Sequence, residues 1–137
     1  MSTLSKLGLA LFVALHLASC STGSINDSDP AVLFKDAEED IASDRYEMAL
    51  EKLRTVRNKF PYSNYSVLAR LRIADVYFLQ ETFSEAAASY ETFKDLHPNH
   101  EKTAYAMFRL GESYYNDNPT NIARDQSSAK KALEAYE

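Results

Sequence analysis

The sequence predicts an all-α protein, a solenoid of helix-turn-helix units, and three observations lead to this prediction. The chain has 137 residues but only three glycines, and two of them, Gly8 and Gly23, precede the main body. Apolar residues of the body recur at i, i+3, i+4 and i+7, which is typical of amphipathic helices. Equivalent residues also recur 37 positions apart, as Pro61 and Pro98 do, and a fixed period indicates a repeat architecture.

Residues 1–19 are predicted to be a signal peptide. Lys6 precedes an apolar stretch, Leu7–Leu17, which is shorter than the roughly 20 residues that span a bilayer. Leu17-Ala18-Ser19-Cys20 resembles the bacterial lipobox, which implies cleavage before Cys20 and lipid attachment to that cysteine. The alternative is an ordinary secretory signal with a cysteine nearby by chance.

Residues 20–29 are predicted to be a flexible tether, because they are small, polar and without periodicity. An aspartate directly after the lipidated cysteine usually marks retention in the inner membrane. Ser21 occupies that position here. The sequence therefore predicts an outer-membrane lipoprotein, anchored through lipid on the periplasmic face.

Residues 30–137 are predicted to form the repeats, with units at 30–63, 64–100 and 101–137. In the first unit the apolar spacing predicts helices over 30–43 and 46–59, the second ended by a proline. The second unit repeats this pattern. The paired residues at the offset of 37 include Ala37 and Ala74, Tyr46 and Phe83, Ala49 and Ala86, Ala74 and Gly111, and Tyr77 and Tyr114.

The third unit departs from the period through an insertion, predicted at 116–128. The helix pattern resumes at Ala132 and Tyr136, nine positions later than the period requires. We expect Ser127 or Ser128 to cap this helix. The last repeat is predicted to be truncated, which indicates a piece of a longer protein or an interrupted reading frame.

The unit resembles the tetratricopeptide repeat, although its period exceeds the usual 34 residues. Small residues stand where the two helices of a unit cross, and a proline closes each of the first two units. In the first unit Asp36 and Asp40 replace the Ile73 and Tyr77 of the second. We expect these two aspartates on a polar outer face, because a terminal repeat has no upstream neighbour.

Composition excludes several functional classes. The chain has 15 basic and 20 acidic residues, for a net charge of −5, which argues against nucleic-acid binding. The single cysteine forms no internal disulfide and no cysteine-based zinc site. No catalytic constellation is present, so we expect no enzyme and no cofactor. His97 and His100 fit a solvated turn better than a metal site.

Charged residues also follow the period. Lys35, Arg72 and Arg109 recur, each with an acidic residue three positions later. They form either an i, i+3 ion pair on each helix or a polar ladder in a concave peptide-binding groove. Neighbouring rows, Phe34, Leu71 and Phe108, and Ile41, Phe78 and Tyr115, are either groove contacts or inter-repeat core. The candidate peptide-binding residues are Phe34, Lys35, Leu71, Arg72, Phe108, Arg109 and Tyr115.

A lipobox followed by repeats of 37 residues resembles the family of the outer-membrane protein assembly factor BamD. Phe60-Pro61-Tyr62-Ser63 resembles its first repeat junction, and the insertion containing Arg124, Asp125 and Gln126 resembles its third-repeat insertion. The alternative for these three residues is a polar loop with Asp125 near a helix start. The resemblance covers Leu17 to Glu137 but only three of the family's usual five repeats.

The resemblance implies a scaffold that helps β-barrel proteins to fold and insert into the outer membrane. Its partners would be a BamA-type β-barrel subunit, other lipoproteins of the assembly machinery and unfolded β-barrel precursors. The membrane would be reached through the lipid anchor. The alternative is a general periplasmic tetratricopeptide lipoprotein that recruits cell-envelope or peptidoglycan enzymes.

Overall fold

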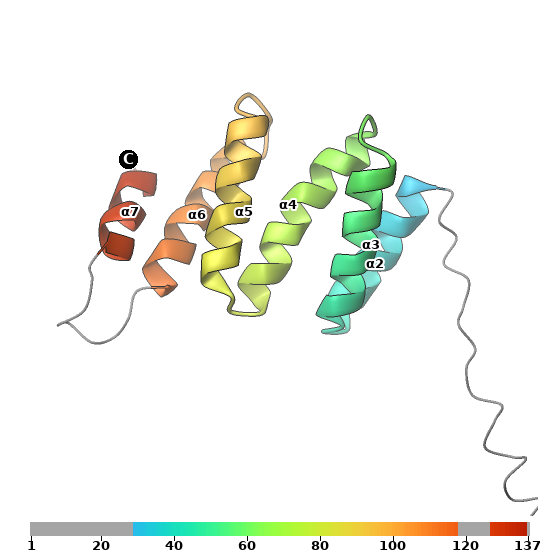
Figure 1. Cartoon of the computed structure of the whole chain (residues 1–137), viewed down its shortest axis with the longest axis horizontal. Helices are drawn as coiled ribbons and strands as arrows, with labels where there is room; N and C mark the ends of the chain where they lie inside the picture. The colour runs from blue at the N-terminus through green and yellow to red at the C-terminus, as the bar shows by residue number, and fades with distance from the viewer. Residues whose placement is uncertain (1–28, 118–126, 137) are drawn as a thin grey trace, which may run out of the picture.

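The computed structural model describes residues 29–117 and 127–136 and contains six α-helices in that part of the chain. They are α2 (Pro30–Ala42), α3 (Tyr46–Lys59), α4 (Asn64–Leu79), α5 (Phe83–Leu96), α6 (Thr103–Asn116) and α7 (Ser127–Tyr136). Figure 1 shows them side by side in chain order, from α2 at one end to α7 at the other. Each helix contacts the next, and α2 also contacts α4. The predicted all-α solenoid is confirmed.

Local sequence signals account for the helix ends. The Ala31 N–H donates to the Asp29 side chain at 2.8 Å, and a proline occupies the first helical position of α2. Ser63 caps α4 by accepting a bond from the Tyr65 N–H. Helices α3 and α5 each end two residues before a proline. The helices predicted at 30–43 and 46–59 therefore lie where expected, the first ending one residue earlier.

The turns between the two helices of a repeat share one backbone conformation. Asp44 and Glu81 both have positive φ, of 56° and 60°, and they lie 37 positions apart. This left-handed region favours glycine, but neither turn contains one. In each turn the next backbone N–H donates to a carbonyl in the last turn of the preceding helix, at 2.9 and 3.0 Å. The repeat period therefore extends to the turn geometry.

Two hydrophobic clusters form the core, one for each junction between repeats. The first joins α2, α3 and α4, and the second joins α4, α5 and α6. Tyr77 packs against both clusters and so links the two junctions. The small residues predicted at the helix crossings, Ala37, Ala49, Ala74 and Ala86, are fully buried, as close helix approach requires.

The third unit ends in the predicted helix. Ala132 is buried, and α7 packs against α6. The ends of the predicted insertion are helical, since α6 reaches Asn116 and α7 begins at Ser127. Cys20 and the Arg124-Asp125-Gln126 motif lie outside the described residues. No helix among residues 29–117 and 127–136 combines the length and apolar character that a membrane crossing needs.

The prediction for Asp40 is wrong. Its side chain does not lie on a polar outer face, because the residue is only 2% exposed. The carboxylate is bound by Arg45 at 2.7 Å and by Lys52 at 2.5 Å. A charge can be buried when such partners compensate its lost hydration. Asp40 therefore joins α2 to α3 within the first repeat. Asp36 is only half-buried.

Replacing Asp40 with asparagine should destabilise the protein at neutral pH but progressively less in acid. Burial alone would raise the pKa of Asp40, but hydrogen bonds from Lys52 and Arg45 hold that pKa below its usual 3.8. The ionised carboxylate therefore stabilises the fold fully above about pH 4, and this contribution is lost as the pH falls through the folded-state pKa. Urea unfolding of both proteins between pH 7 and pH 2 measures the difference. A difference independent of pH would contradict the assignment.

Candidate peptide-binding groove

The first helices of the three repeats, α2, α4 and α6, line a pocket of about 430 Å³. Its walls are mainly apolar, and charged groups stand among them. Because the pocket crosses two repeat junctions, it can hold a segment of extended chain rather than one compact group. The lining residues are Phe34, Glu38, Leu68, Leu71, Arg72, Asp75, Lys102 and Tyr105.

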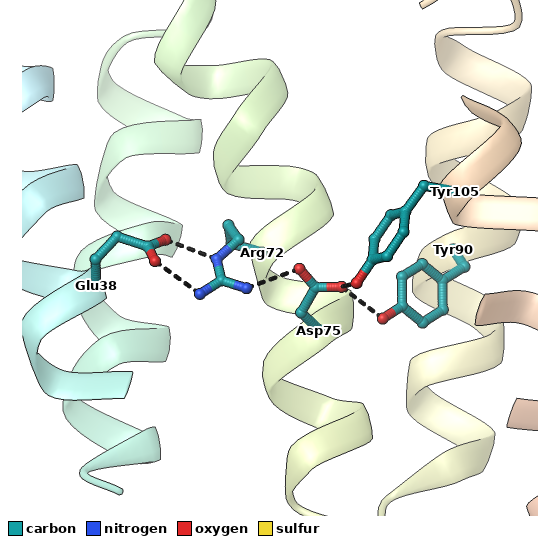
Figure 2. Close-up of polar contacts among 5 residues, drawn as sticks. All are labelled: Glu38, Arg72, Asp75, Tyr90 and Tyr105. Carbon is teal, nitrogen blue, oxygen red and sulfur yellow. Dashed lines mark hydrogen bonds and ion pairs between the residues drawn. The ribbon is translucent and has the colours of Figure 1, made fainter. Parts of the chain in front are cut away.

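Arg72 is the centre of a polar network at this pocket (Figure 2). Its Nε and Nη2 donate to the two carboxylate oxygens of Glu38, at 2.6 and 2.7 Å. Its Nη1 donates to Asp75 at 2.9 Å. The hydrogen bonds from Arg72 to Glu38 raise the pKa of Arg72, so the guanidinium stays charged. The network therefore joins α2 to α4, across the first repeat junction.

Asp75 carries the network across the second junction. Its Oδ1 accepts hydrogen bonds from the hydroxyls of Tyr90 at 2.6 Å and Tyr105 at 2.9 Å. Burial raises the pKa of both tyrosines, and the negative charge of Asp75 raises it further. Both phenols therefore remain neutral donors at physiological pH. The buried Asp75 carboxylate is satisfied by Arg72 and two hydroxyls from α5 and α6.

The predicted row of i, i+3 ion pairs is only partly correct. Arg72 pairs with Asp75, and Arg109 pairs with Glu112 at 2.7 Å, as expected. Lys35 instead lies 3.4 Å from Glu39, with its side chain 78% exposed. Glu38 binds Arg72 of the next repeat, because the planar guanidinium offers a bidentate contact that a lysine cannot provide. The first repeat therefore lacks the predicted i, i+3 ion pair between Lys35 and Glu38.

The structure places only some of the predicted site residues in the pocket. Phe34, Leu71 and Arg72 line it. Phe108 and Tyr115 do not line it, although they are 54% and 71% exposed on α6. Arg109 also lies outside the pocket, and its guanidinium carbon Cζ is 3.6 Å from the centre of the Phe78 ring. Lys35 is exposed and is not a lining residue.

Ile41, Phe78 and Tyr115 do not share one environment. Ile41 is buried in the first hydrophobic cluster, and Phe78 packs against Phe83 with ring centres 5.2 Å apart. The core alternative is therefore correct for Ile41 and Phe78, whereas Tyr115 is largely exposed.

Sequence reasoning missed three lining residues, Leu68, Lys102 and Tyr105. Leu68 and Tyr105 are 37 positions apart, so the repeat period could have predicted that they occupy equivalent positions. Lys102 precedes α6 and belongs to no apolar row. Its contribution to the pocket depends on where the turn between α5 and α6 places it.

The histidine turn is built around an aromatic side chain. The rings of His97 and His100 lie 5.2 and 5.6 Å from the ring of Phe93, between centres. Burial lowers the pKa of His97, and the positive charge of Arg70 lowers it further. Among the residues described, no group of three or more His, Cys, Asp or Glu side chains is arranged to hold a metal ion.

Comparison with known proteins places these features in a family. The model of the YfiO family, described as outer membrane lipoprotein, matches residues 26–137. The chain belongs to this family. Its match includes all the helices described above and the residues of the groove.

Individual relatives of this YfiO family member carry a more specific name. The outer membrane protein assembly factor BamD of Neisseria gonorrhoeae is 23% identical over 97% of this chain and 56% of its own length. The protein of the same name from Vibrio cholerae is 27% identical over 76% of this chain and 43% of its own length. The one from Caulobacter vibrioides is 22% identical over 92% and 43%, respectively. The chain thus spans about half the length of these relatives.

Proposed function

We propose that the chain is a BamD-like lipoprotein scaffold of the outer-membrane β-barrel assembly machinery and has no catalytic role. Cys20 carries the lipid anchor, and the repeats face the periplasm. The partners are a BamA-type β-barrel subunit, other lipoproteins of the machinery and unfolded β-barrel precursors. Membership in the YfiO family and relatives named as assembly factors support this proposal.

The proposal that the chain binds β-barrel precursors rests on the pocket lined by α2, α4 and α6. Phe34, Leu68 and Leu71 offer apolar contact to a segment that is not yet folded. Such segments expose apolar side chains and unpaired backbone groups before they join a sheet. A groove that runs along several repeats matches the extended shape of this ligand.

Lys102 provides the electrostatic recognition in this proposal. The Arg72 fork is already occupied by Glu38 and Asp75. Within residues 29–117 and 127–136, Lys102 forms no ion pair, and it lines the mainly apolar pocket. The groove therefore selects precursor segments in which an acidic group lies close to apolar side chains.

A purification from mildly solubilised envelopes tests the proposal. The natural full-length product carries a C-terminal tag, and its partners are identified by mass spectrometry. We expect a BamA-type barrel subunit together with β-barrel precursors. Lys102→Glu should reduce precursor recovery about fivefold, the equivalent of roughly 1 kcal/mol. It should leave the barrel subunit bound.

Lys130→Glu is the matched control, because Lys130 is an exposed lysine on α7 and does not line the groove. It should leave precursor recovery unchanged. If Lys102→Glu recovered as much precursor as the natural protein, the result would contradict precursor binding by the groove. Recovery of peptidoglycan enzymes without a barrel subunit would contradict the assembly role and favour a general envelope adaptor.

A further inference from the structure

A second pocket, the arginine cleft, lies between α3, α4 and α5 and measures about 190 Å³. Arg57 and Arg70 line it together with Ser89 and Thr92, and Ile73 and Phe93 are its buried apolar residues. Arg70 precedes Arg72 by two positions, which is about 200° around an α-helix. Arg70 and Arg72 therefore lie on opposite sides of α4, and the arginine cleft is separate from the peptide groove.

The positive charge of the arginine cleft is not neutralised within the described residues. Neither Arg57 nor Arg70 forms an ion pair with a carboxylate in that part of the chain. The Arg57 Nε donates to the Asn58 amide oxygen at 3.0 Å. Burial lowers the pKa of Arg57, and the positive charges of Arg70 and Arg54 lower it further. The charges of Arg57 and Arg70 therefore repel each other, and both residues are half-buried.

Three other arginines of the described part of the chain are neutralised by a carboxylate, and a fourth, Arg54, donates to the Tyr77 hydroxyl at 2.8 Å. Arg45, Arg72 and Arg109 each bind a carboxylate. The chain has 20 acidic residues against 15 basic ones, so carboxylates are not scarce. Arg57 and Arg70 line one cleft and have no acidic partner within residues 29–117 and 127–136, so the cleft is suited to binding an anion.

We propose that the arginine cleft binds a phosphate group. A phosphate monoester carries between about −1.5 and −2 charges at neutral pH, which matches two guanidiniums, whereas one carboxylate would neutralise only one. Its oxygens can accept bidentate hydrogen bonds from both planar forks. Ser89 adds a hydroxyl at the wall, while the Thr92 hydroxyl already donates to the Ala88 carbonyl at 2.8 Å.

The phosphate can come from a soluble phosphate ester or from a lipid headgroup. Both sources present the same chemistry to the cleft. The family is one of outer membrane lipoproteins, so phospholipid headgroups are within reach of its members. The experiment must therefore separate a site for soluble phosphate from one used at a membrane surface.

The first measurement is an NMR titration of the isotope-labelled full chain, in a nonionic detergent at pH 7.5, with inorganic phosphate. We expect saturable shifts of the side-chain N–H signals of Arg57 and Arg70. The double variant Arg57→Gln, Arg70→Gln should bind phosphate at least about tenfold more weakly, because both forks are lost. Lys130→Gln removes one exposed positive charge on α7 and should leave the affinity unchanged.

Circular dichroism and thermal unfolding verify that the double variant is folded. If it does not fold, Arg57→Lys, Arg70→Lys keeps both charges but removes the planar forks. It should then bind phosphate more weakly than the natural protein and retain its fold. Unchanged affinity in a folded cleft variant, or no saturable shift in the natural protein, would overturn the proposal.

Vesicles distinguish the two sources of phosphate. The full chain is sedimented with phosphatidylcholine vesicles that either contain or lack phosphatidic acid. Stronger sedimentation with phosphatidic acid, lost in the double variant, assigns the site to a lipid headgroup. Phosphate binding without this difference assigns it to soluble esters. Saturable binding of an acidic peptide at the cleft, with no phosphate binding, would overturn the proposal in favour of a protein partner.

Discussion

Replacing Arg72 with alanine should lower the free energy of unfolding by about 3 kcal/mol. The change removes a bidentate contact to Glu38 and the ion pair to the buried Asp75. Asp75 would keep its two tyrosine donors but lose its positive partner. An uncompensated buried carboxylate is costly because it has lost its hydration. Urea unfolding at pH 7, followed by circular dichroism, measures the loss.

Lys35→Ala is the matched control for Arg72→Ala. Lys35 holds the equivalent position one repeat earlier, but its ion pair with Glu39 is exposed. Exposed pairs of this kind contribute less than about 0.5 kcal/mol. Equal losses for Arg72→Ala and Lys35→Ala would show that the network does not hold the repeats together. Arg72→Lys, which keeps the charge but not the fork, should give an intermediate loss.

Replacing Leu53 with alanine should destabilise the protein by about 3 kcal/mol. Leu53 has no exposed surface and lies in the first hydrophobic cluster, among residues of α2, α3 and α4. Truncation loses the burial of three carbon atoms and leaves a cavity that surrounding helices fill only in part. Because the cluster joins two repeats, the cost should appear as a shift of the whole unfolding transition, measured in urea.

Leu96→Ala makes the same chemical change at the end of α5, where the leucine is 54% exposed. It creates no enclosed cavity, so its cost should stay below about 1 kcal/mol. A comparable loss in the two leucine variants would mean that Leu53 is not in a close-packed core. A broadened transition in Leu53→Ala alone would mean that the first repeat unfolds separately.

The repeat architecture could be predicted because its determinants are local and periodic. Pro61 and Pro98 mark the helix ends in sequence, and Ala49 and Ala86 mark the close crossings. In a solenoid each unit contacts mainly its neighbours, so one period read along the chain predicts most of the packing. The same period made Phe34 and Leu71 candidates for the groove, with inter-repeat core as the alternative, and both residues line the pocket.

The period could not predict which members of a row line the groove. Phe34 and Leu71 line it, but Phe108, their equivalent one unit later, is exposed beyond it. A position in the repeat decides the face of the helix on which a side chain lies. How far the neighbouring helix covers that face depends on the three-dimensional packing of each unit.

Residue type and spacing along the chain were enough to predict the helices, their order and the buried small residues at their crossings. The partners of the charged side chains, in contrast, follow from the three-dimensional packing of the repeats. Glu38 binds Arg72, 34 positions away, rather than Lys35 on its own helix, and Asp40 is buried against Arg45 and Lys52. Helix formation depends on spacing within a few turns. The partner of a charge depends on which groups the fold brings within hydrogen-bond distance, in an environment where burial makes an unpaired charge costly.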